Sequence, residues 1–260
     1  MSKFIEALNQ LSQGDTQPIG FTQRAKSSPK AKIQIVISLA AERAESLINH
    51  VSGADAGLIT ASKATAFAEA MQKVSGSTSD ITWGGWMSDT SPAKAKQLSK
   101  AGGDFMVFSA TDTTVISNEN DKTGKILAVD AFLNEGLLRA VNKLPLDAVL
   151  ITSGENQSAT ITWQRLMIFR RFADLLTKPL LVSVQSQVTS GMLMVLWEAG
   201  VMGVVMEMDE KQPEDGIKKL RQDIDKMDFS STRKSERTEI SLPRTGRESA
   251  TTAPEIEEEY

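Results

Sequence analysis

Residues 100–108, KAGGDFMVF, decide how this chain is interpreted. Gly102-Gly103-Asp104 forms a small turn, and a short, continuously apolar run follows it at once. Glycine permits a tight turn, and an uninterrupted apolar run of this length is typical of a parallel strand covered on both faces. The same order occurs at Gly53-Ala54-Asp55 and at Pro145-Leu146-Asp147, and Ala199-Gly200-Val201 takes the same place further along.

These turns belong to a regular alternation. Short apolar runs predict eight strands, at 33–39, 56–60, 81–84, 105–109, 126–130, 148–152, 180–184 and 203–207. Amphipathic stretches between most of them predict helices, the first of which carries Ala44, Leu47 and Val51 and ends at Gly53. The turn signal precedes the even-numbered strands, so the chain repeats with a period of two strand–helix units.

Eight such units over residues 32–227 fit a single (β/α)8 barrel near the compact end of its size range. The alternative is an open, doubly wound sheet. An open sheet of eight parallel strands would be large, and nothing in the sequence marks an edge strand. The sequence therefore favours a closed α/β barrel.

The two stretches 100–108 and 198–205, each with a helix end, an Ala-Gly turn and an apolar strand, resemble the compact aldolase-type (TIM) barrels. That superfamily includes small aldolases, phosphoribosyl isomerases and flavin-dependent oxidoreductases. The resemblance covers residues 32–227 and implies the fold. The matching residues are loop and core positions, so no catalytic motif comes with it.

Two flanking segments have a different composition. Residues 1–31 are predicted to form a leader helix, with Phe4, Ile5, Leu8 and Leu11 at helical spacing, and an extended linker. Residues 228–260 are polar, show no apolar periodicity and are predicted to be a disordered tail. The domain organisation is therefore leader 1–31, barrel 32–227 and tail 228–260.

One unit of the barrel departs from the pattern. Between the fourth and fifth strands, residues 110–125 carry Val115 and Ile116 as their apolar pair and are otherwise polar. This predicts a degenerate fourth helix, replaced by a long loop or one helical turn. A sharper hypothesis is that the leader helix or a second subunit covers the gap, which would make the protein a homo-oligomer through this side.

Composition excludes several classes of function. The chain has 260 residues, a net charge of −4, no cysteine and a single histidine, His50. Thiol catalysis, Zn–Cys sites, Fe–S clusters and multi-histidine metal sites are therefore excluded, and no excess positive charge favours nucleic acid or anionic membranes. No apolar run is long enough to span a bilayer, and the N-terminus lacks a secretory h-region, so the sequence predicts a cytoplasmic protein without a membrane partner.

In barrels of this type the chemistry sits at the carboxyl ends of the strands. Three carboxylates follow strand ends: Asp130, Glu155 and Glu207. If they converge, they could act as a general acid–base pair or hold Mg²⁺, which prefers oxygen ligands. The structural alternatives are that Asp130 caps a helix, that Glu155 is solvated and that Glu207 is a surface charge.

Other side chains at the same end are candidates for substrate binding. Trp83 and Trp86 flank Gly84-Gly85, where an indole could stack on a flat ligand or simply plug the barrel. Lys63 follows the second strand, and a solvated lysine is favoured there over a Schiff-base lysine. Ser153 and Gln185, which follow the sixth and seventh strands, complete this set.

The loops that usually bind phosphate argue against a phosphorylated ligand. The loop 185–189 contains no glycine, and the eighth helix opens with Glu214-Asp215. Acidic residues at a helix N-terminus would repel a phosphate or an FMN tail. The cofactor is unknown from sequence: Mg²⁺ is compatible with the carboxylates, whereas FMN and phosphate at the usual barrel site are disfavoured.

Two functions stay open, and the sequence does not decide whether the protein is an enzyme. The first is a carboxylate-dependent lyase or isomerase acting on a small, non-phosphorylated organic molecule. The second is a non-catalytic barrel that serves as a scaffold or protein-interaction module through its surface or its C-terminal tail.

Overall fold

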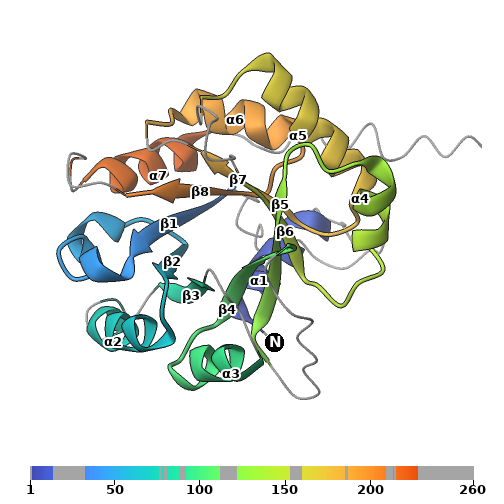
Figure 1. The fold of residues 1–260 in the computed structure, drawn as a ribbon. Coiled ribbons are helices and arrows are strands. Elements are labelled where there is room, and N and C mark those ends of the chain that lie inside the picture. Colours follow the sequence, from blue (N-terminus) through green and yellow to red (C-terminus); the bar gives the residue numbers. More distant parts are fainter. Residues whose placement is uncertain are drawn as a thin grey trace, which may run out of the picture. The chain divides into compact units, whose positions relative to one another are not determined.

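Eight parallel strands pair in chain order, and β8 pairs with β1, so the sheet closes into a barrel (Figure 1). This computed structural model describes residues 2–13, 33–75, 78, 81–87, 92–111, 122–152, 160–184, 187–208, 213 and 215–227. The chain divides into two units, Met1–Ser230 and Ser231–Tyr260, and all of the second lies outside the described residues, as does the linker at 14–32. The predicted (β/α)8 fold is confirmed.

The strand boundaries agree closely with the apolar runs. The strands are β1 (Gln34–Ala40), β2 (Ala56–Ala61), β3 (Thr82–Met87), β4 (Phe105–Ser109), β5 (Gly124–Asp130), β6 (Ala148–Thr152), β7 (Leu180–Val184) and β8 (Gly203–Glu207). The helices are α1 (Lys3–Gln13), α2 (Ala64–Ser75), α3 (Pro92–Lys100), α4 (Glu135–Val141), α5 (Trp163–Leu175), α6 (Ser190–Glu198) and α7 (Gly216–Lys226).

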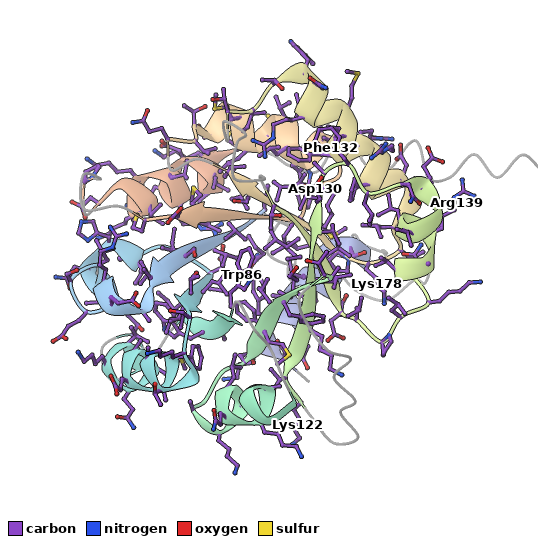
Figure 2. All side chains as sticks on the ribbon, viewed as in Figure 1. Trp86, Lys122, Asp130, Phe132, Arg139 and Lys178 are labelled. Carbon is purple, nitrogen blue, oxygen red and sulfur yellow. The ribbon has the colours of Figure 1, made fainter. Side chains whose placement is uncertain are left out.

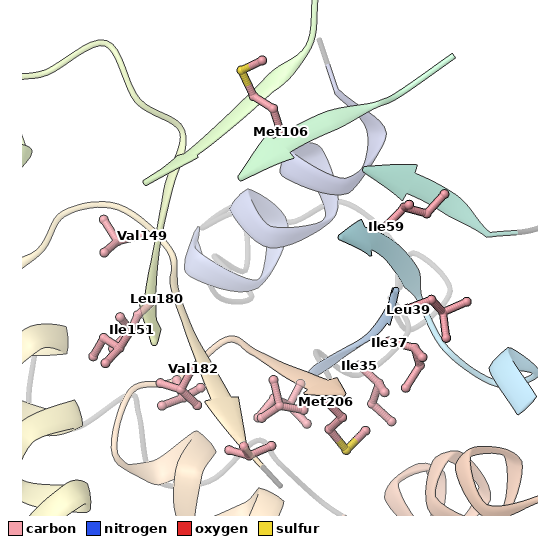
Figure 3. Close-up of a cluster of buried hydrophobic side chains, with 14 of the residues drawn as sticks. Ile35, Ile37, Leu39, Ile59, Met106, Val149, Ile151, Leu180, Val182 and Met206 are labelled. Carbon is pink, nitrogen blue, oxygen red and sulfur yellow. The ribbon is translucent and has the colours of Figure 1, made fainter. Parts of the chain in front are cut away.

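Side chains on each strand alternate between two buried clusters. The outer cluster lies between the sheet and the helices, and Figure 3 shows part of it, including Ile35, Ile37 and Met206, on the outside of the ring of strands. The inner cluster fills the barrel and contains Val36 and Val205 from neighbouring strands. This period of two assigns every strand residue to the inside or the outside of the barrel.

The helical ring is incomplete between β1 and β2. Between β1 and β2 the structure has two 3₁₀ turns, η1 (Ala41–Arg43) and η2 (Ile48–Val51), where the sequence predicted an α-helix. Ala44, Leu47 and His50 are all buried, a spacing of three that suits the 3₁₀ turn. The predicted degeneracy between β4 and β5 stays a prediction, because residues 112–121 lie outside the described residues.

Helix α1 closes the amino end of the barrel. Phe4, Ile5 and Leu8 are buried and belong to the inner cluster, and the Phe4 ring lies 4.7 Å from that of Phe105, the first residue of β4. A Cβ on Gly124, the first residue of β5, would lie 2.5 Å from Ile5 Cγ1, so the glycine leaves room for the helix. Helix α1 therefore lies against the first residues of β4 and β5 and points Phe4, Ile5 and Leu8 into the barrel. Cover of the β4–β5 gap by the leader or by a second subunit stays a prediction.

The aspartates of the repeated turn explain how this end is fixed. Asp55 Oδ2 accepts a hydrogen bond from the Ile35 amide at 2.7 Å, and Asp147 Oδ2 accepts one from the Lys125 amide at 2.8 Å. Each carboxylate therefore ties the turn before an even-numbered strand to the beginning of the preceding strand. Asp55 also pairs with Arg221 of α7, whose pKa is lowered because the guanidinium is buried.

Asp104 uses its carboxylate differently. It accepts hydrogen bonds from the Ser2 hydroxyl at 2.6 Å and from the amides of Lys3 and Phe4 at 2.9 and 3.0 Å. The two amides are orphan donors at the N-terminus of α1, so a residue about a hundred positions away caps the helix. The second copy of the repeat along the chain therefore anchors α1 in the barrel.

Candidate functional site at the carboxyl end of the barrel

The carboxyl ends of the eight strands form what we call the mouth of the barrel. On each strand, the alternation between the clusters identifies the side chains that face inward near this end. We define the mouth ring as one such residue from each strand, from β1 to β8 in order: Ser38, Thr60, Trp86, Ser109, Asp130, Thr152, Ser183 and Glu207. On β1 the inward face continues one position further, to Ala40, which is in register with Thr60. Seven of the eight are polar, whereas the inner cluster below them is apolar.

Contacts and pairing on one side of the ring support the assignment. Ser38 Oγ and Thr60 Oγ1 lie 3.1 Å apart and share a hydrogen bond, so these side chains from β1 and β2 face each other. Thr60 is in register with Trp86 on β3, and Ser38 is in register with Glu207 on β8. Glu207, Ser38, Thr60 and Trp86 therefore follow one another around this part of the mouth.

The two tryptophans of β3 lie on opposite faces of the sheet. Trp86 packs against the inner cluster and is labelled near the centre of the ring of strands in Figure 2. Trp83 is 4% exposed in the outer cluster, and its Nε1 donates a hydrogen bond to Thr78 Oγ1 at 3.0 Å. Trp83 lies near the beginning of β3, because the strand continues to Met87. Trp83 and Trp86 are three positions apart, and an odd separation puts two side chains on opposite faces of a strand. The structure therefore brings only Trp86 to the mouth.

Asp130 is exposed at the end of β5 (Figure 2). Its Oδ1 accepts a hydrogen bond from the Phe132 amide at 2.7 Å, which holds one carboxylate oxygen in a turn after the strand. Asn134, not Asp130, caps α4, since its side chain accepts from the Leu137 amide at 2.9 Å. The helix-capping alternative for Asp130 is therefore replaced by a turn that orients its carboxylate.

The loop after Asp130 is held from α5. Arg171 donates from one guanidinium nitrogen to the carbonyls of Ala131 and Leu133, both at 3.3 Å. The guanidinium also lies 5.5 Å from the centre of the Phe172 ring. Arg171 thus ties α5 to the turn that carries Asp130.

Glu207 is exposed at the end of β8. Its strand partner is Ser38, and the next residue, Met208, donates its amide to the Ser38 carbonyl at 3.0 Å. The backbone around Glu207 is therefore fixed by β1, whereas the side chain is accessible to solvent. Asp130 and Glu207 come from strands that are not neighbours, so they approach the mouth from different sides of the barrel.

Arg165 adds a positive charge near β7. Its guanidinium donates to the Ser183 carbonyl at 3.4 Å and lies 5.5 Å from the centre of the Phe169 ring. Partial burial lowers the pKa of Arg165 below its ordinary value. Arg165 was not predicted from the sequence, because it lies in the first turn of α5 and not at a strand end.

The remaining predicted residues are placed as follows. Lys63 is exposed, two positions beyond the end of β2, and its carbonyl accepts from the Phe67 amide at the beginning of α2. Glu155, Ser153 and Gln185 lie outside the described residues. Of the eight predicted site residues, the structure assigns Trp86, Asp130 and Glu207 to the mouth ring.

Five ring members were not among the site residues predicted from the sequence: Ser38, Thr60, Ser109, Thr152 and Ser183. They lie within the strands, whereas most of the predicted residues follow the end of a predicted strand. Their signal was present: a hydroxyl residue interrupts the apolar alternation on the face that points inward. Only the strand register shows which face that is.

Three further observations concern the described part of the chain. No group of three or more His, Asp or Glu residues there is arranged to hold a metal ion. At the beginning of α6, the Thr189 hydroxyl already accepts from the Met192 amide at 3.3 Å. Among the same residues no helix has the length and apolar character that a membrane crossing requires.

The architecture defines the class: a (β/α)8 barrel with a polar mouth and a helix inserted at its amino end. No protein-family model and no curated protein matches the chain. Solved structures of the alpha subunit of tryptophan synthase are similar in fold.

The subunit from Legionella pneumophila str. Paris aligns with a TM-score of 0.58 at 13% identity, covering 87% of this chain and all of its own. A mutant alpha subunit from Pyrococcus furiosus aligns with a TM-score of 0.56 at 8% identity, covering 75% of this chain and 97% of its own. Mycobacterium tuberculosis tryptophan synthase gives 0.55 at 13% identity, with 75% and 92% covered. At these identities the likeness establishes the fold.

Proposed function

We propose that the mouth is an active site, in which Asp130 and Glu207 exchange protons with a small, non-phosphorylated organic molecule in a lyase or isomerase reaction. One observation carries this proposal: the two carboxylates occupy the last inward positions of β5 and β8, at the end where barrels of this class hold their chemistry. The solved neighbours, subunits of the enzyme tryptophan synthase, support a catalytic use of the fold.

The two carboxylates suit complementary roles. One removes a proton from a carbon next to a carbonyl group, and the other exchanges a proton with the carbonyl oxygen or a leaving hydroxyl. Asp130 suits the first role because the Phe132 amide fixes one of its oxygens. Glu207 suits the second because its side chain is accessible and longer. A cytoplasmic location remains a prediction of the sequence, and Mg²⁺ remains compatible with the carboxylates.

The test is proton exchange in D₂O, which needs no knowledge of the product. The full chain is incubated with a panel of neutral hydroxy ketones and hydroxy aldehydes, and deuterium incorporation next to the carbonyl is followed by NMR. We expect exchange above the buffer rate, and a loss of about a hundredfold in Asp130→Asn and Glu207→Gln. Glu135→Gln, which removes an exposed carboxylate from α4, is the matched control and should exchange like the parent.

Exchange that persists in both mouth variants would contradict the assigned roles. The panel is repeated with MgCl₂ and with EDTA. An exchange rate that rises with MgCl₂ and falls with EDTA would indicate that a bound cation takes part in the reaction. An exchange rate that neither addition changes would indicate that the carboxylates act without a metal ion.

A second candidate function is a protein scaffold that associates with another copy of itself. Four large apolar side chains near α4 and α5 are more than half exposed: Phe132 (65%), Leu137 (54%), Trp163 (82%) and Met167 (66%). Exposed apolar side chains in this number favour an interface. Sedimentation equilibrium tests it: a dimer weakened by Trp163→Ser supports the scaffold, and a monomer at high protein concentration contradicts it.

A further inference from the structure

We propose that the ligand of the mouth is a neutral, polyhydroxylated molecule of the sugar or polyol class. Its C–H face would stack on the Trp86 indole, and its hydroxyl groups would bond to the mouth ring. This inference rests on the proposed function for its location. It adds the chemical class of the ligand, which neither the fold nor the comparisons supply.

The first argument is the hydrogen-bonding character of the ring. Five of its eight members are serine or threonine, from β1, β2, β4, β6 and β7. A hydroxyl group both donates and accepts, whereas an ammonium only donates and a phosphate dianion only accepts. Hydroxyl side chains spread around a ring therefore match a ligand that also carries hydroxyl groups around a ring.

The second argument is that, among the described residues, several ring hydroxyls use only part of their hydrogen-bonding capacity. Ser109 is the most engaged, since its Oγ lies 2.9 Å from Thr111 Oγ1 and accepts from the Thr111 amide at 3.3 Å. Ser38 and Thr60 share one hydrogen bond, which leaves one of their two protons to donate. Thr152 donates to the Val129 carbonyl at 3.3 Å and keeps its lone pairs. Asp130 uses one oxygen on the Phe132 amide, so its second oxygen can accept from a ligand hydroxyl.

The third argument is the single large apolar surface in the ring. Trp86 is partly buried against the inner cluster, which holds its indole in place. Sugars present C–H groups on one face and hydroxyls around the edge, so an indole and a polar ring together complement both. Burial of aromatic surface supplies the affinity, and the hydroxyls supply the orientation.

Charge separates this class from two others. Asp130 and Glu207 place two carboxylates at the mouth, and the guanidinium of Arg165 near β7 already donates to the Ser183 carbonyl. The carboxylates therefore disfavour a phosphorylated or carboxylated ligand beside them. An amine could pair with these carboxylates and with the Trp86 face. An amine would, however, make no use of the donor capacity of the hydroxyls, so the composition of the ring favours the neutral polyol.

The experiment measures binding by tryptophan fluorescence and thermal shift on the full chain in a Trp163→Phe background, which removes the most exposed indole. The probes are neutral monosaccharides and inositol, with spermidine and choline as amines and a sugar phosphate as the anion. We expect saturable binding of at least one neutral probe. Affinity should fall at least tenfold in Trp86→Ala and about threefold in Trp86→Phe, a variant that preserves the apolar packing.

Matched controls separate the mouth from the rest of the protein. Trp83→Phe alters the buried tryptophan of the same strand and should bind within twofold of the parent. Ser183→Ala should weaken binding about fivefold, whereas Ser99→Ala, an exposed serine of α3, should not.

Binding of neutral probes that depends on Trp86 supports the inference, even where the proton-exchange test of the proposed function fails. Amines that bind in place of sugars would overturn the ligand class but keep the mouth as the site. Sugar binding that ignores every mouth variant, or no binding of any neutral probe, would overturn the inference as well.

Discussion

The two ends of the barrel are built from the same eight strands but differ in what their polar side chains do. At the amino end, the carboxylates of Asp55, Asp104 and Asp147 each accept hydrogen bonds from backbone amides. At the mouth, Asp130 and Glu207 are exposed, and hydroxyl groups keep capacity for further bonds. The comparison shows that one end is fixed by internal bonds, and the other is left able to bond to something else.

The apolar side chains show the same division. Phe4, Ile5 and Leu8 enter the barrel from the amino end and join its inner cluster. At the mouth, the ring contributes one large apolar side chain, Trp86, which faces the same cluster from the other side. Stability should therefore depend mainly on the amino end, and function on the mouth.

The largest effect is expected from Leu8→Ala. Leu8 is fully buried, at 0% exposure, so its truncation leaves a cavity inside the barrel. We expect the free energy of unfolding to fall by about 3 kcal/mol, measured by urea denaturation. Leu11→Ala, one turn further and only partly buried, is the control and should cost less than half as much. Equal losses would mean that α1 does not insert as described.

A smaller effect is expected from Asp104→Ala, which removes the cap from α1. Three donors lose their acceptor, and we expect a loss of about 2 kcal/mol in the free energy of unfolding. In a double-mutant cycle, Asp104→Ala and Ser2→Ala should couple by about 1 kcal/mol. Asp147→Ala, the equivalent aspartate that bonds to β5, should show no coupling to Ser2→Ala. Coupling of both aspartates to Ser2 would remove the distinction between them.

Changes in the mouth hydroxyls are expected to matter less for stability. Thr60→Val keeps the shape of the side chain and removes one hydrogen bond to Ser38. Because the residue lies at the rim, where water can replace the bond, we expect a change below about 1 kcal/mol. The same variant should weaken the binding of a neutral polyol. A stability loss as large as that of Asp104→Ala would show that the mouth is structural.

The smallest effect is a pH dependence at the amino end. Lys178 donates to the carbonyls of Leu144 and Leu146, and burial lowers its pKa below the ordinary 10.5, with Asp147 opposing the shift. The folded state therefore releases this proton at a lower pH than the unfolded state. Stability should rise slightly as the pH approaches 10.5, and Lys178→Gln should remove that rise. A steeper fall of stability in the parent than in the variant over this range would contradict the sign.

Much of the fold could be predicted because its signal is local. The runs at 105–109, 148–152 and 203–207 match β4, β6 and β8 residue for residue. The strand at β3 proved longer than its apolar run, because Gly84-Gly85 interrupts the pattern although the pairing continues to Met87. The first helix was wrong because an apolar spacing of three or four does not distinguish an α-helix from 3₁₀ turns.

The site and the position of α1 depend on contacts that the local pattern does not contain. The partner of the α1 N-terminus is Asp104, about a hundred residues away, and no spacing rule connects them. Thr60 and Ser38 could be recognised only after the register had set them side by side. Trp83 was predicted at the mouth because the predicted strand ended at residue 84, whereas β3 continues to Met87. The longer strand puts Trp83 near its beginning and on the outer face of the sheet.

The central claim is that the amino end of the barrel supplies stability and the mouth supplies function. The double variant Asp130→Asn/Glu207→Gln tests this claim most directly. Asn retains the acceptor for the Phe132 amide, and the pair of changes removes two negative charges from the mouth. We predict that its free energy of unfolding, measured by urea denaturation, stays within about 1 kcal/mol of the parent or rises, as is common at functional sites. A loss comparable with that of Leu8→Ala would contradict the account, since the mouth carboxylates would then hold the barrel together.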